Sequence, residues 1–518
     1  MKNRDLQATW NYHNGTKHSY ESIRANAHYL DFENQPTPLK IYSDLPAIPL
    51  PEHLSSAGVT ALDAISITET RPDGSVIPTI QTLAEILYLS AGITKRRSYP
   101  GGEMLFRAAA CTGALYHIDL YLACGEISDL PAGVYQFSPQ DFALRRLRAG
   151  DYRKALADAS GNETAVMNAP AVVIFASTYW RNAWKYQARA YRHCYWDTGT
   201  ILANFLAAAA ARRVPARIVL GFVDSTVSQL IGLDAAKEGT IALAALGSNG
   251  DKTSSVSAGM EPLRLETAPL SKSEVDYPAI REMHEASSLD SAQEVSEWRQ
   301  APSARSESPA TSRATAEHLI PLQSLPDDQL PTESLETVIQ RRGSTRQFSR
   351  DPISFAELST LLNRATGDIS SDFMGSTEPL LNDLYLIVHA VDGLAPGAYV
   401  FHKGGSALEL LKEGNFRHDA GYLGLGQEIP ADCSVDVFFL TDLKSVLSRL
   451  GNRGYRAAQL EASIMGGKLY LAAYALGLGA SGLTFFDDDV TEFFSPHSAG
   501  KSVMFLIAIG KSVRRRKT

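Results

Sequence analysis

The chain has 518 residues, of which 44% are hydrophobic and 20% are charged, and its formal net charge is −8 at pH 7. A chain of this length usually exceeds one hydrophobic core, so we expect two domains with the composition of a soluble globular protein. The negative charge argues against general affinity for nucleic acid. The most apolar stretch, from Ile201 to Ala211, is far shorter than the roughly 20 residues of a membrane span, so we expect no membrane partner.

The start of the chain and its cysteines indicate the compartment. No apolar run follows Met1, so the sequence predicts no signal peptide and a cytoplasmic protein. The cysteines are scattered and form no C-x-x-C motif, which predicts neither a disulfide framework nor a metal site. They are Cys111, Cys124, Cys194 and Cys433.

Residues 1–60 differ in composition from the rest of the chain. They are polar and aromatic at first and then rich in proline, which predicts an extended arm that wraps a domain. The prolines are Pro36, Pro38, Pro46, Pro49 and Pro51.

An internal repeat organises most of the remaining sequence. Three separated blocks recur with the same spacing between the copies, which predicts a duplicated domain over residues 61–250 and 337–518. The matching blocks are Leu130–Tyr135 with Leu394–Tyr399, Asp119–Leu122 with Asp383–Leu386, and Ala190–Arg192 with Gly454–Arg456.

Each copy is expected to contain a long helix rich in small residues. In the second copy this helix covers Leu460 to Ala475, and Gly466 and Gly467 would let a neighbouring helix approach closely. Gly477 or Gly479 would end it. The pattern fits a tight helix–helix interface and an ordinary core helix equally well.

The segment between the copies, residues 251–336, is rich in Ser, Glu, Pro and Ala. This composition predicts a linker that is partly disordered, with one short helix near Ala292–Arg299.

The motif that carries most chemistry is Arg342-Gly343-Ser344-Thr345-Arg346-Gln347-Phe348, at the start of the second copy. In an extended chain, alternate side chains point the same way, so Arg342, Ser344 and Arg346 would together form a cradle for a phosphate. Ser354 and Glu357 then predict a capped helix start. A solvated basic turn fits the same spacing.

Arg-x-Ser-x-Arg-x-Phe at this position resembles the flavin-phosphate motif of the nitroreductase family. The block from Gly454 to Gly482 and the closing strand Phe505–Lys511 resemble the second half of the same family. The order of these motifs along both copies is similar to that of the SagB/ThcOx-type dehydrogenase branch. The resemblance implies an α+β fold with two tandem nitroreductase-like domains, which form an intrachain pseudo-dimer with flavin mononucleotide (FMN) at the interface.

The two copies differ at the phosphate motif. A carboxylate and an apolar side chain replace two of its groups in the first copy, so we expect a degraded phosphate site there and one FMN per chain, although Arg96 and Arg97 of an insertion could rescue the site. The replacements are Ile67 for Arg342, Glu69 for Ser344 and Arg71 for Arg346.

The resemblance assigns cofactor contacts to both copies. In the second copy it implies the phosphate motif, a turn close to flavin N5 and a cation near N1, and in the first copy a small polar segment over the flavin. These residues are Arg342, Gly343, Ser344, Arg346, Ser481, Gly482, Lys511, Arg514, Cys111 and Thr112.

Lys185 and Tyr186 match a Lys-Tyr pair that removes protons in azoline-oxidising members of the branch. A surface lysine and a packed tyrosine are the plainer interpretation. We therefore expect an FMN-dependent oxidoreductase that transfers hydride through N5, with azoline oxidation of a modified peptide as the leading activity. The alternatives are an NAD(P)H-dependent reductase of nitro compounds or quinones and a non-catalytic flavin-binding or scaffold protein.

Overall fold

The computed structural model describes residues 2–26, 28–67, 74–100, 102–249, 260–301, 319–374 and 379–513. Of the residues compared at the phosphate motif and the candidate site residues, Glu69, Arg71 and Arg514 lie outside these ranges. Among the described helices, none is long and apolar enough to cross a membrane.

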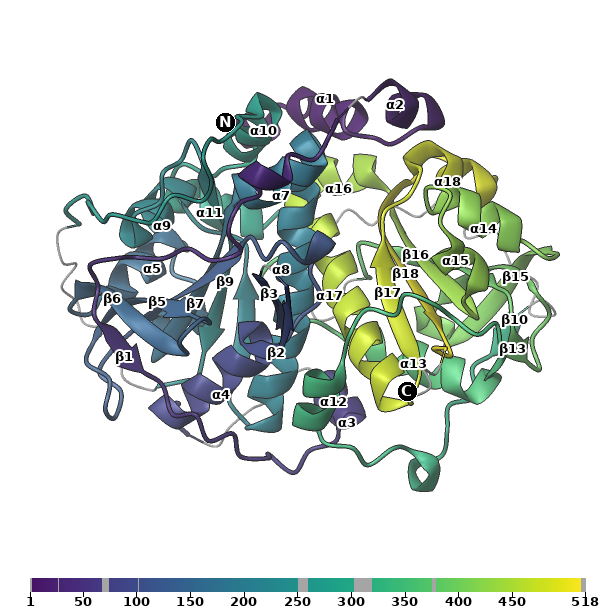
Figure 1. The fold of residues 1–518 in the computed structure, drawn as a ribbon, viewed down its shortest axis with the longest axis horizontal. Helices are drawn as coiled ribbons and strands as arrows, with labels where there is room; N and C mark the ends of the chain where they lie inside the picture. Colours follow the sequence, from purple (N-terminus) through teal and green to yellow (C-terminus); the bar gives the residue numbers. More distant parts are fainter. Residues whose placement is uncertain are drawn as a thin grey trace.

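Two seven-stranded sheets of the same topology dominate the described part of the chain (Figure 1). The first has the order β1 (Ala47–Pro49), β6 (Ala143–Ala149), β5 (Gly133–Ser138), β4 (Ile118–Cys124), β7 (Ala171–Thr178), β9 (Glu238–Leu246) and β8 (Ala216–Val219). The second has the order β10 (Leu319–Pro321), β15 (Ala407–Glu413), β14 (Gly397–His402), β12 (Asp383–Val388), β16 (Val435–Thr441), β18 (Ser502–Gly510) and β17 (Gly479–Leu483). We call the parts of the chain built on these sheets the first half and the second half.

Helices cover the sheets in the same order in each half. The first half contains α3 (Ala61–Ser66), α4 (Ile80–Ala91), α5 (Arg153–Ala159), α6 (Thr164–Asn168), α7 (Tyr179–Tyr186), α8 (Ala190–Ala211) and α9 (Asp224–Ile231). The second contains α12 (Leu335–Arg341), α13 (Phe355–Ala365), α14 (Arg417–Leu423), α15 (Glu428–Asp432), α16 (Leu443–Leu450), α17 (Arg453–Ala475) and α18 (Asp487–Phe493). The predicted capping box is present, because Ser354 and Glu357 bond each other's backbone N–H at the start of α13.

The long helices α8 and α17 cross between the two sheets (Figure 1). Glycine makes this crossing possible: a Cβ on Gly199 would lie 1.9 Å from Ser463 Oγ, and one on Gly467 would lie 2.5 Å from Ala203 Cβ. The tight helix–helix interface expected from the small residues is therefore present, and Gly477, at φ +73°, follows the end of α17.

Buried ion pairs cross the same interface with twofold symmetry. Asp224 of the first half accepts hydrogen bonds from Arg453 and Arg456, each at 2.6 Å. Asp487 of the second half accepts equivalent bonds from Arg189 at 2.8 Å and Arg192 at 2.5 Å. Arg192 and Arg456 belong to the repeated blocks, and Arg189 and Arg453 directly precede them, so the repeat builds both sides of one interface.

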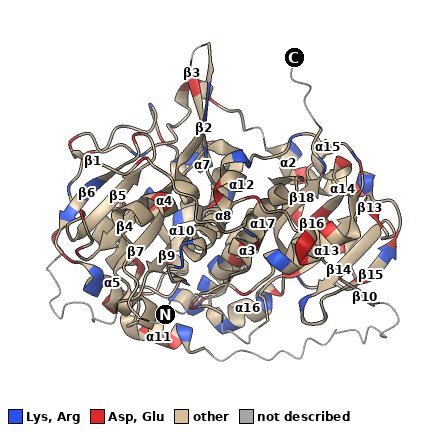
Figure 2. Ribbon diagram, turned by 90° about the horizontal axis from the view of Figure 1, so that it is seen from below, with Lys and Arg blue, Asp and Glu red and all other residues tan. Residues whose placement is uncertain are grey.

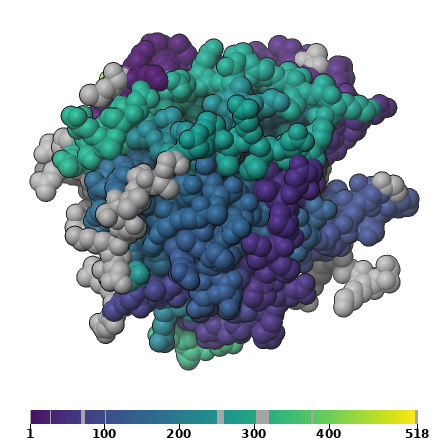
Figure 3. Space-filling view, turned by 90° about the vertical axis from the view of Figure 1, so that its left-hand side faces the viewer, coloured from purple at the N-terminus to yellow at the C-terminus, as the bar shows by residue number. Residues whose placement is uncertain are grey.

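The arm and the segment between the copies lie on the surface of this core. In Figure 3 the purple surface of the arm runs down over the blue surface of the first half. The arm contains α1 (Gln7–Gly15) and α2 (Tyr20–Ala25), and the expected linker contains α10 (Pro278–Ala286) and α11 (Ala292–Arg299). The sequence predicted α11 but not α10. His13 O of α1 accepts from Arg192, and His284 O of α10 accepts from Arg456, so the two helices occupy equivalent positions.

Two short two-stranded sheets complete the described fold. The strands β11 (Ile353–Ser354) and β13 (Val391–Asp392) pair in the second half. The hairpin of β2 (Ile93–Tyr99) and β3 (Gly102–Arg107) projects from one edge of the molecule (Figure 2). This hairpin is the insertion that carries Arg96, which bonds Glu103 and Gln140 O rather than a phosphate site.

Candidate active site

A cavity of about 310 Å³ lies between the two halves. Both halves contribute to its wall, so the site depends on the association of the two copies. The first half contributes Ala110, Cys111, Thr112, Gly113, Lys185, Tyr186, Trp196, Asp197 and Thr200. The second contributes Ser344, Arg346, Gln427, Tyr470, Ser481, Gly482, Leu483, Thr484 and Phe505.

The phosphate motif presents two of its polar side chains to this cavity. The backbone N–H of buried Thr345 donates to Ala480 O at 2.8 Å, which fixes the extended chain against β17. Ser344 and Arg346, on either side of Thr345, line the cavity. Arg346 is exposed and forms no hydrogen bond or ion pair with any residue that the structure describes. Its guanidinium is therefore free to bind an anion.

The remaining members of the motif lie elsewhere. Arg342 does not line the cavity: its Nε donates to Ala108 O at 3.0 Å and its Nη2 to Arg107 O at 3.2 Å. Burial lowers the pKa of Arg342. It therefore tethers the chain segment of the first half that leads into the cavity wall. A Cβ on Gly343 would make only ordinary contact, at 3.5 Å from Tyr474.

Lys511 is the predicted cation after the closing strand. It is exposed and does not line the cavity, and its carbonyl accepts from Ser349 N at 2.9 Å. The structure therefore brings Ser344 and Arg346 into the cavity and leaves Arg342 and Lys511 outside its wall.

The edge strand β17 and the residue that follows it provide polar atoms that have no partner within the described chain. Ser481 Oγ and Thr484 Oγ1 are buried without a hydrogen bond, and both residues line the cavity. Buried hydroxyls are normally bonded, so these two indicate a ligand with polar groups. The backbone N–H of Gly482 donates to Tyr470 OH, which lies 3.3 Å from Ser344 Oγ.

The loop with Cys111 and Thr112 is held in place by Asp197 of α8. The carboxylate accepts from Thr112 N at 2.9 Å, Thr112 Oγ1 at 2.8 Å and Cys111 Sγ at 3.0 Å. Burial and the Asp197 charge raise the pKa of the Cys111 thiol well above its usual value. Cys111 is consequently a poor nucleophile, and the loop offers its small residues and Gly113 to the cavity.

Lys185 and Tyr186 lie at the C-terminal end of α7, on the first-half side of the cavity. Burial lowers the pKa of Lys185, and Arg346 across the cavity lowers it further. Burial raises the pKa of Tyr186, whose ring packs edge-on against His193 with 4.6 Å between centroids. The pair thus combines an amine that is easier to deprotonate with a hydroxyl that keeps its proton.

Several wall residues were not predicted from the sequence. Trp196, Tyr470 and Phe505 lie inside apolar patterns that equally describe a core, so nothing marks them as ligand contacts. Asp197 could have been noticed in the sequence, because it lies about one turn before an alanine-rich, buried stretch of helix. A carboxylate buried there needs hydrogen-bond donors.

A much smaller cavity of about 20 Å³, room for about one water, lies near the symmetry-related position, where Leu206 is the counterpart of Tyr470. There, residues after α13 pair with β8: Ile218 N donates to Ser370 O at 2.9 Å, and Asp372 N donates to Ile218 O at 3.0 Å. The Asp372 carboxylate also accepts from Leu220 N at 2.8 Å and Gly221 N at 2.9 Å. We call this small cavity the twin cavity; backbone of the second half, paired with β8, lies beside it.

Fold and site together define a two-domain protein with a large interface cavity, whose wall offers a guanidinium and hydroxyls without partners among the described residues, and aromatic side chains. The nitroreductase family model matches residues 107–248 and 339–511. The chain belongs to the nitroreductase family. The predicted α+β fold of two nitroreductase-like domains is confirmed, and members of this family are flavoproteins.

Some known proteins resemble nearly the whole chain, and others resemble about a third of it. The crystal structure of a candidate nitroreductase from Anabaena variabilis is 25% identical, with a TM-score of 0.75, and covers 98% of this chain and 99% of its own. A candidate nitroreductase of Methanocaldococcus jannaschii, MJ1384, is 24% identical over 153 residues, which are 30% of this chain and 74% of that protein. An FMN-dependent nitroreductase from Clostridium difficile covers 34% of this chain and 87% of its own, at 15% identity and a TM-score of 0.24.

Proposed function

We propose that the chain is an FMN-dependent oxidoreductase that binds its cofactor in the interface cavity. The proposal rests on one observation. The same cavity is lined by Arg346 and Ser344 of the second half and by Lys185 and Tyr186 of the first half. Arg346 and Ser344 would hold the phosphate of FMN. The unpartnered hydroxyls of Ser481 and Thr484 would bond polar groups of the flavin or its ribityl chain, and the aromatic wall would cover the rings.

Bound FMN supplies hydride transfer. Lys185 is the proton acceptor in this proposal, because burial and the charge of Arg346 favour its neutral form. Tyr186 remains a hydrogen-bond donor, because its pKa is raised. At the equivalent positions the second half has Arg449 and Leu450, so the Lys-Tyr pair is present in the first half and is not repeated in the second.

Within this reaction class we propose the SagB/ThcOx-type branch, in which an azoline ring of a modified peptide is oxidised to an azole. The Lys185–Tyr186 pair supports this choice, because removal of a ring proton needs a base at the site of hydride transfer. The alternative is an NAD(P)H-dependent reductase of nitro compounds or quinones, which the names of the relatives favour. That reaction delivers hydride to the acceptor and needs no base in place of Lys185.

We further propose one FMN per chain. The twin cavity leaves about 20 Å³, against about 310 Å³ in the interface cavity, and drug-sized ligands usually occupy at least about 300 Å³. Ile67, the counterpart of Arg342, lines the twin cavity.

The test begins with the purified full chain. Added FMN should be taken up, bleached by dithionite and restored by air, and failure to bind FMN would leave only the scaffold alternative. The loaded chain is then offered a thiazoline-containing peptide, or NADPH with a nitroaromatic compound.

Two variants separate the activities. Lys185→Met and Tyr186→Phe should abolish thiazoline oxidation while FMN stays bound. Lys154→Met, which removes a surface partner of Asp158, is the matched control and should behave like the parent chain. Thiazoline oxidation that survives both substitutions would refute the assigned roles.

A further inference from the structure

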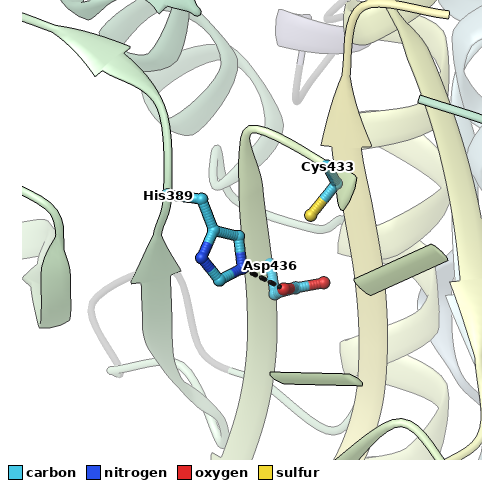
Figure 4. Close-up of side chains that lie close together, drawn as sticks. All are labelled: His389, Cys433 and Asp436. Atoms are coloured by element: carbon cyan, nitrogen blue, oxygen red, sulfur yellow. Dashed lines mark hydrogen bonds and ion pairs between the residues drawn. The ribbon is translucent and has the colours of Figure 1, made fainter. Parts of the chain in front are cut away.

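Three side chains with metal-ligand atoms meet inside the second half, away from the interface cavity (Figure 4). His389 follows strand β12, Cys433 precedes β16, and Asp436 lies within β16. Their ligand atoms lie within 4.8 Å of one another, and His389 Nε2 is 3.0 Å from Asp436 Oδ2. Figure 4 shows the imidazole and the thiol directed towards the carboxylate from two sides.

The cluster is buried, and protein groups satisfy it only in part. The side chains of His389 and Asp436 are 0% exposed, and Cys433 is 0% exposed. His389 Nδ1 has no hydrogen-bond partner within the described chain, and Asp436 Oδ1 has none beyond a contact of the carboxylate with the Cys433 thiol. Unpaired polar atoms at such depth are costly, so a group that binds the cluster would relieve them.

The fold does not require these residues. Strand registers align Val388–Val435 of the second half with Cys124–Ala171 of the first. By the same alignment the first half has Gly125, Ala169 and Val172 where the second half has the three ligands, as the two sequences show. The same architecture therefore forms without any polar side chain at this place.

We propose that His389, Cys433 and Asp436 bind one zinc ion. An imidazole nitrogen, a thiolate and a carboxylate are the donors that Zn²⁺ prefers, and the two anionic ligands neutralise its charge in a buried site. Binding displaces the thiol proton and the proton shared by His389 and Asp436, and both are released to solvent. The carbonyl oxygen of Pro430, 3.2 Å from Cys433 Sγ, offers a fourth ligand.

The position of the zinc site connects it with the phosphate motif. Ser434, between two of the ligands, donates its N–H to Ile509 O at 2.9 Å and its Oγ to Asp351 O at 3.1 Å. Ile509 lies near the end of β18, and Asp351 follows the last residue of the motif, Phe348, by three residues. The ion would hold the ends of β12, β16 and β18 together behind the loop that carries Arg346. Its role is therefore structural.

Hydrogen bonds hold the backbone around Cys433 in place. Arg417 Nη1 donates to Ala431 O at 2.6 Å and to Cys433 O at 3.0 Å, and Ser434 O accepts from His389 N at 2.9 Å. These bonds fix the backbone on both sides of the cysteine, so a metal would enter a site whose ligands are in place. Such preorganisation favours tight binding.

The experiment measures metal in the untagged full chain produced with added zinc sulfate. Mass spectrometry of the purified protein should find one zinc ion per chain. Cys433→Ala and Asp436→Asn should reduce this to a trace. Cys124→Ala, which changes an equally buried cysteine with no ligand neighbours among the described residues, should retain the full amount. A parent chain without zinc, or variants that keep it, would overturn the proposal.

A second measurement does not depend on the stability of the variants. Cobalt(II) replaces zinc in the chelator-treated parent chain, and a thiolate-to-cobalt charge-transfer band should appear at one equivalent. Absence of the band would show that Cys433 is not a ligand. Neither result depends on FMN, so failure of the zinc proposal and failure of the proposed oxidoreductase function can be told apart.

Discussion

Replacement of Arg346 by glutamine tests the phosphate end of the proposed cofactor site. Arg346 is the motif's guanidinium that lines the cavity, and no residue of the described chain pairs with it. The substitution removes the charge, keeps a polar side chain and breaks no hydrogen bond that the structure records. A change in FMN affinity will therefore report on the ligand contact and not on repacking.

The size of the effect follows from the exposure of the side chain. A hydrogen bond to a charged group contributes about 1.5–3 kcal/mol. Because Arg346 is exposed and partly screened by water, we expect the lower part of that range, about 1.5–2 kcal/mol. Since each 1.4 kcal/mol is about a factor of ten, Arg346→Gln should weaken FMN binding roughly 10- to 30-fold.

The assay compares two ligands by fluorescence titration of the flavin-free chain. FMN and riboflavin differ only in the phosphate, so Arg346→Gln should weaken FMN binding and leave riboflavin binding unchanged. Arg350→Gln, which removes a surface cation paired with Asp432, is the control and should affect neither. Equal losses for both flavins, or no loss for FMN, would refute a phosphate contact at Arg346.

Three further predictions concern binding stoichiometry and stability. FMN titration should saturate at one equivalent per chain, and two equivalents would contradict a closed twin cavity. Asp224→Asn should lower the free energy of unfolding in urea by roughly 3–5 kcal/mol, because it leaves two buried arginines without their carboxylate partner. Burial opposes ionisation of Asp224, but Arg453 and Arg456 outweigh it and lower its pKa to about 2. Its stabilisation should therefore be complete above about pH 4 and fade as the pH falls towards 2, and a flat profile would contradict this. Lys468→Met should raise the free energy of unfolding at pH 7 by up to about 3 kcal/mol, because burial lowers the pKa of Lys468 to about 8. The unfolded chain binds the extra proton, so this gain should shrink from pH 8 to about 10.5, and a constant gain would refute the cause.

The duplication and its interface could be predicted because short sequence motifs and single glycines indicate them. The repeated arginine blocks around Arg192 and Arg456 fix the register of the two copies, and Gly467 marks the helix crossing. The capping box at Ser354 likewise needs only short-range information. Such features depend on residues close in sequence or on a repeat that can be counted.

The cavity wall and the metal cluster depend on contacts distant in sequence. Tyr470 and Trp196 look like ordinary core residues until the two halves are placed together. Cys433 has no neighbouring cysteine, and its proposed co-ligand His389 comes from another strand end, so no spacing motif marks the site. Arg342 was expected to face the phosphate, but two carbonyls of the other half accept its hydrogen bonds, which only the assembled interface could reveal.

The two cavities differ through the direction in which an aspartate holds the chain. In the first half, Asp197 of α8 binds the loop at Thr112 within its own half. The counterpart of that loop lies outside the described residues, but Asp372, shortly before it, joins its segment to the residues after β8 of the opposite half, through Leu220 N and Gly221 N. One carboxylate holds its segment within one half, and the other joins its segment to the opposite half.

Closure by backbone pairing has a consequence for the duplicated phosphate motif. Ile67 lines the twin cavity, but the space there is taken by main chain and not by the isoleucine alone. Ile67→Arg would add a cation beside buried Lys468 without making room for a flavin. A second cofactor site would need release of Asp372 first, so the loss of the second site lies in the chain path as much as in the missing arginine.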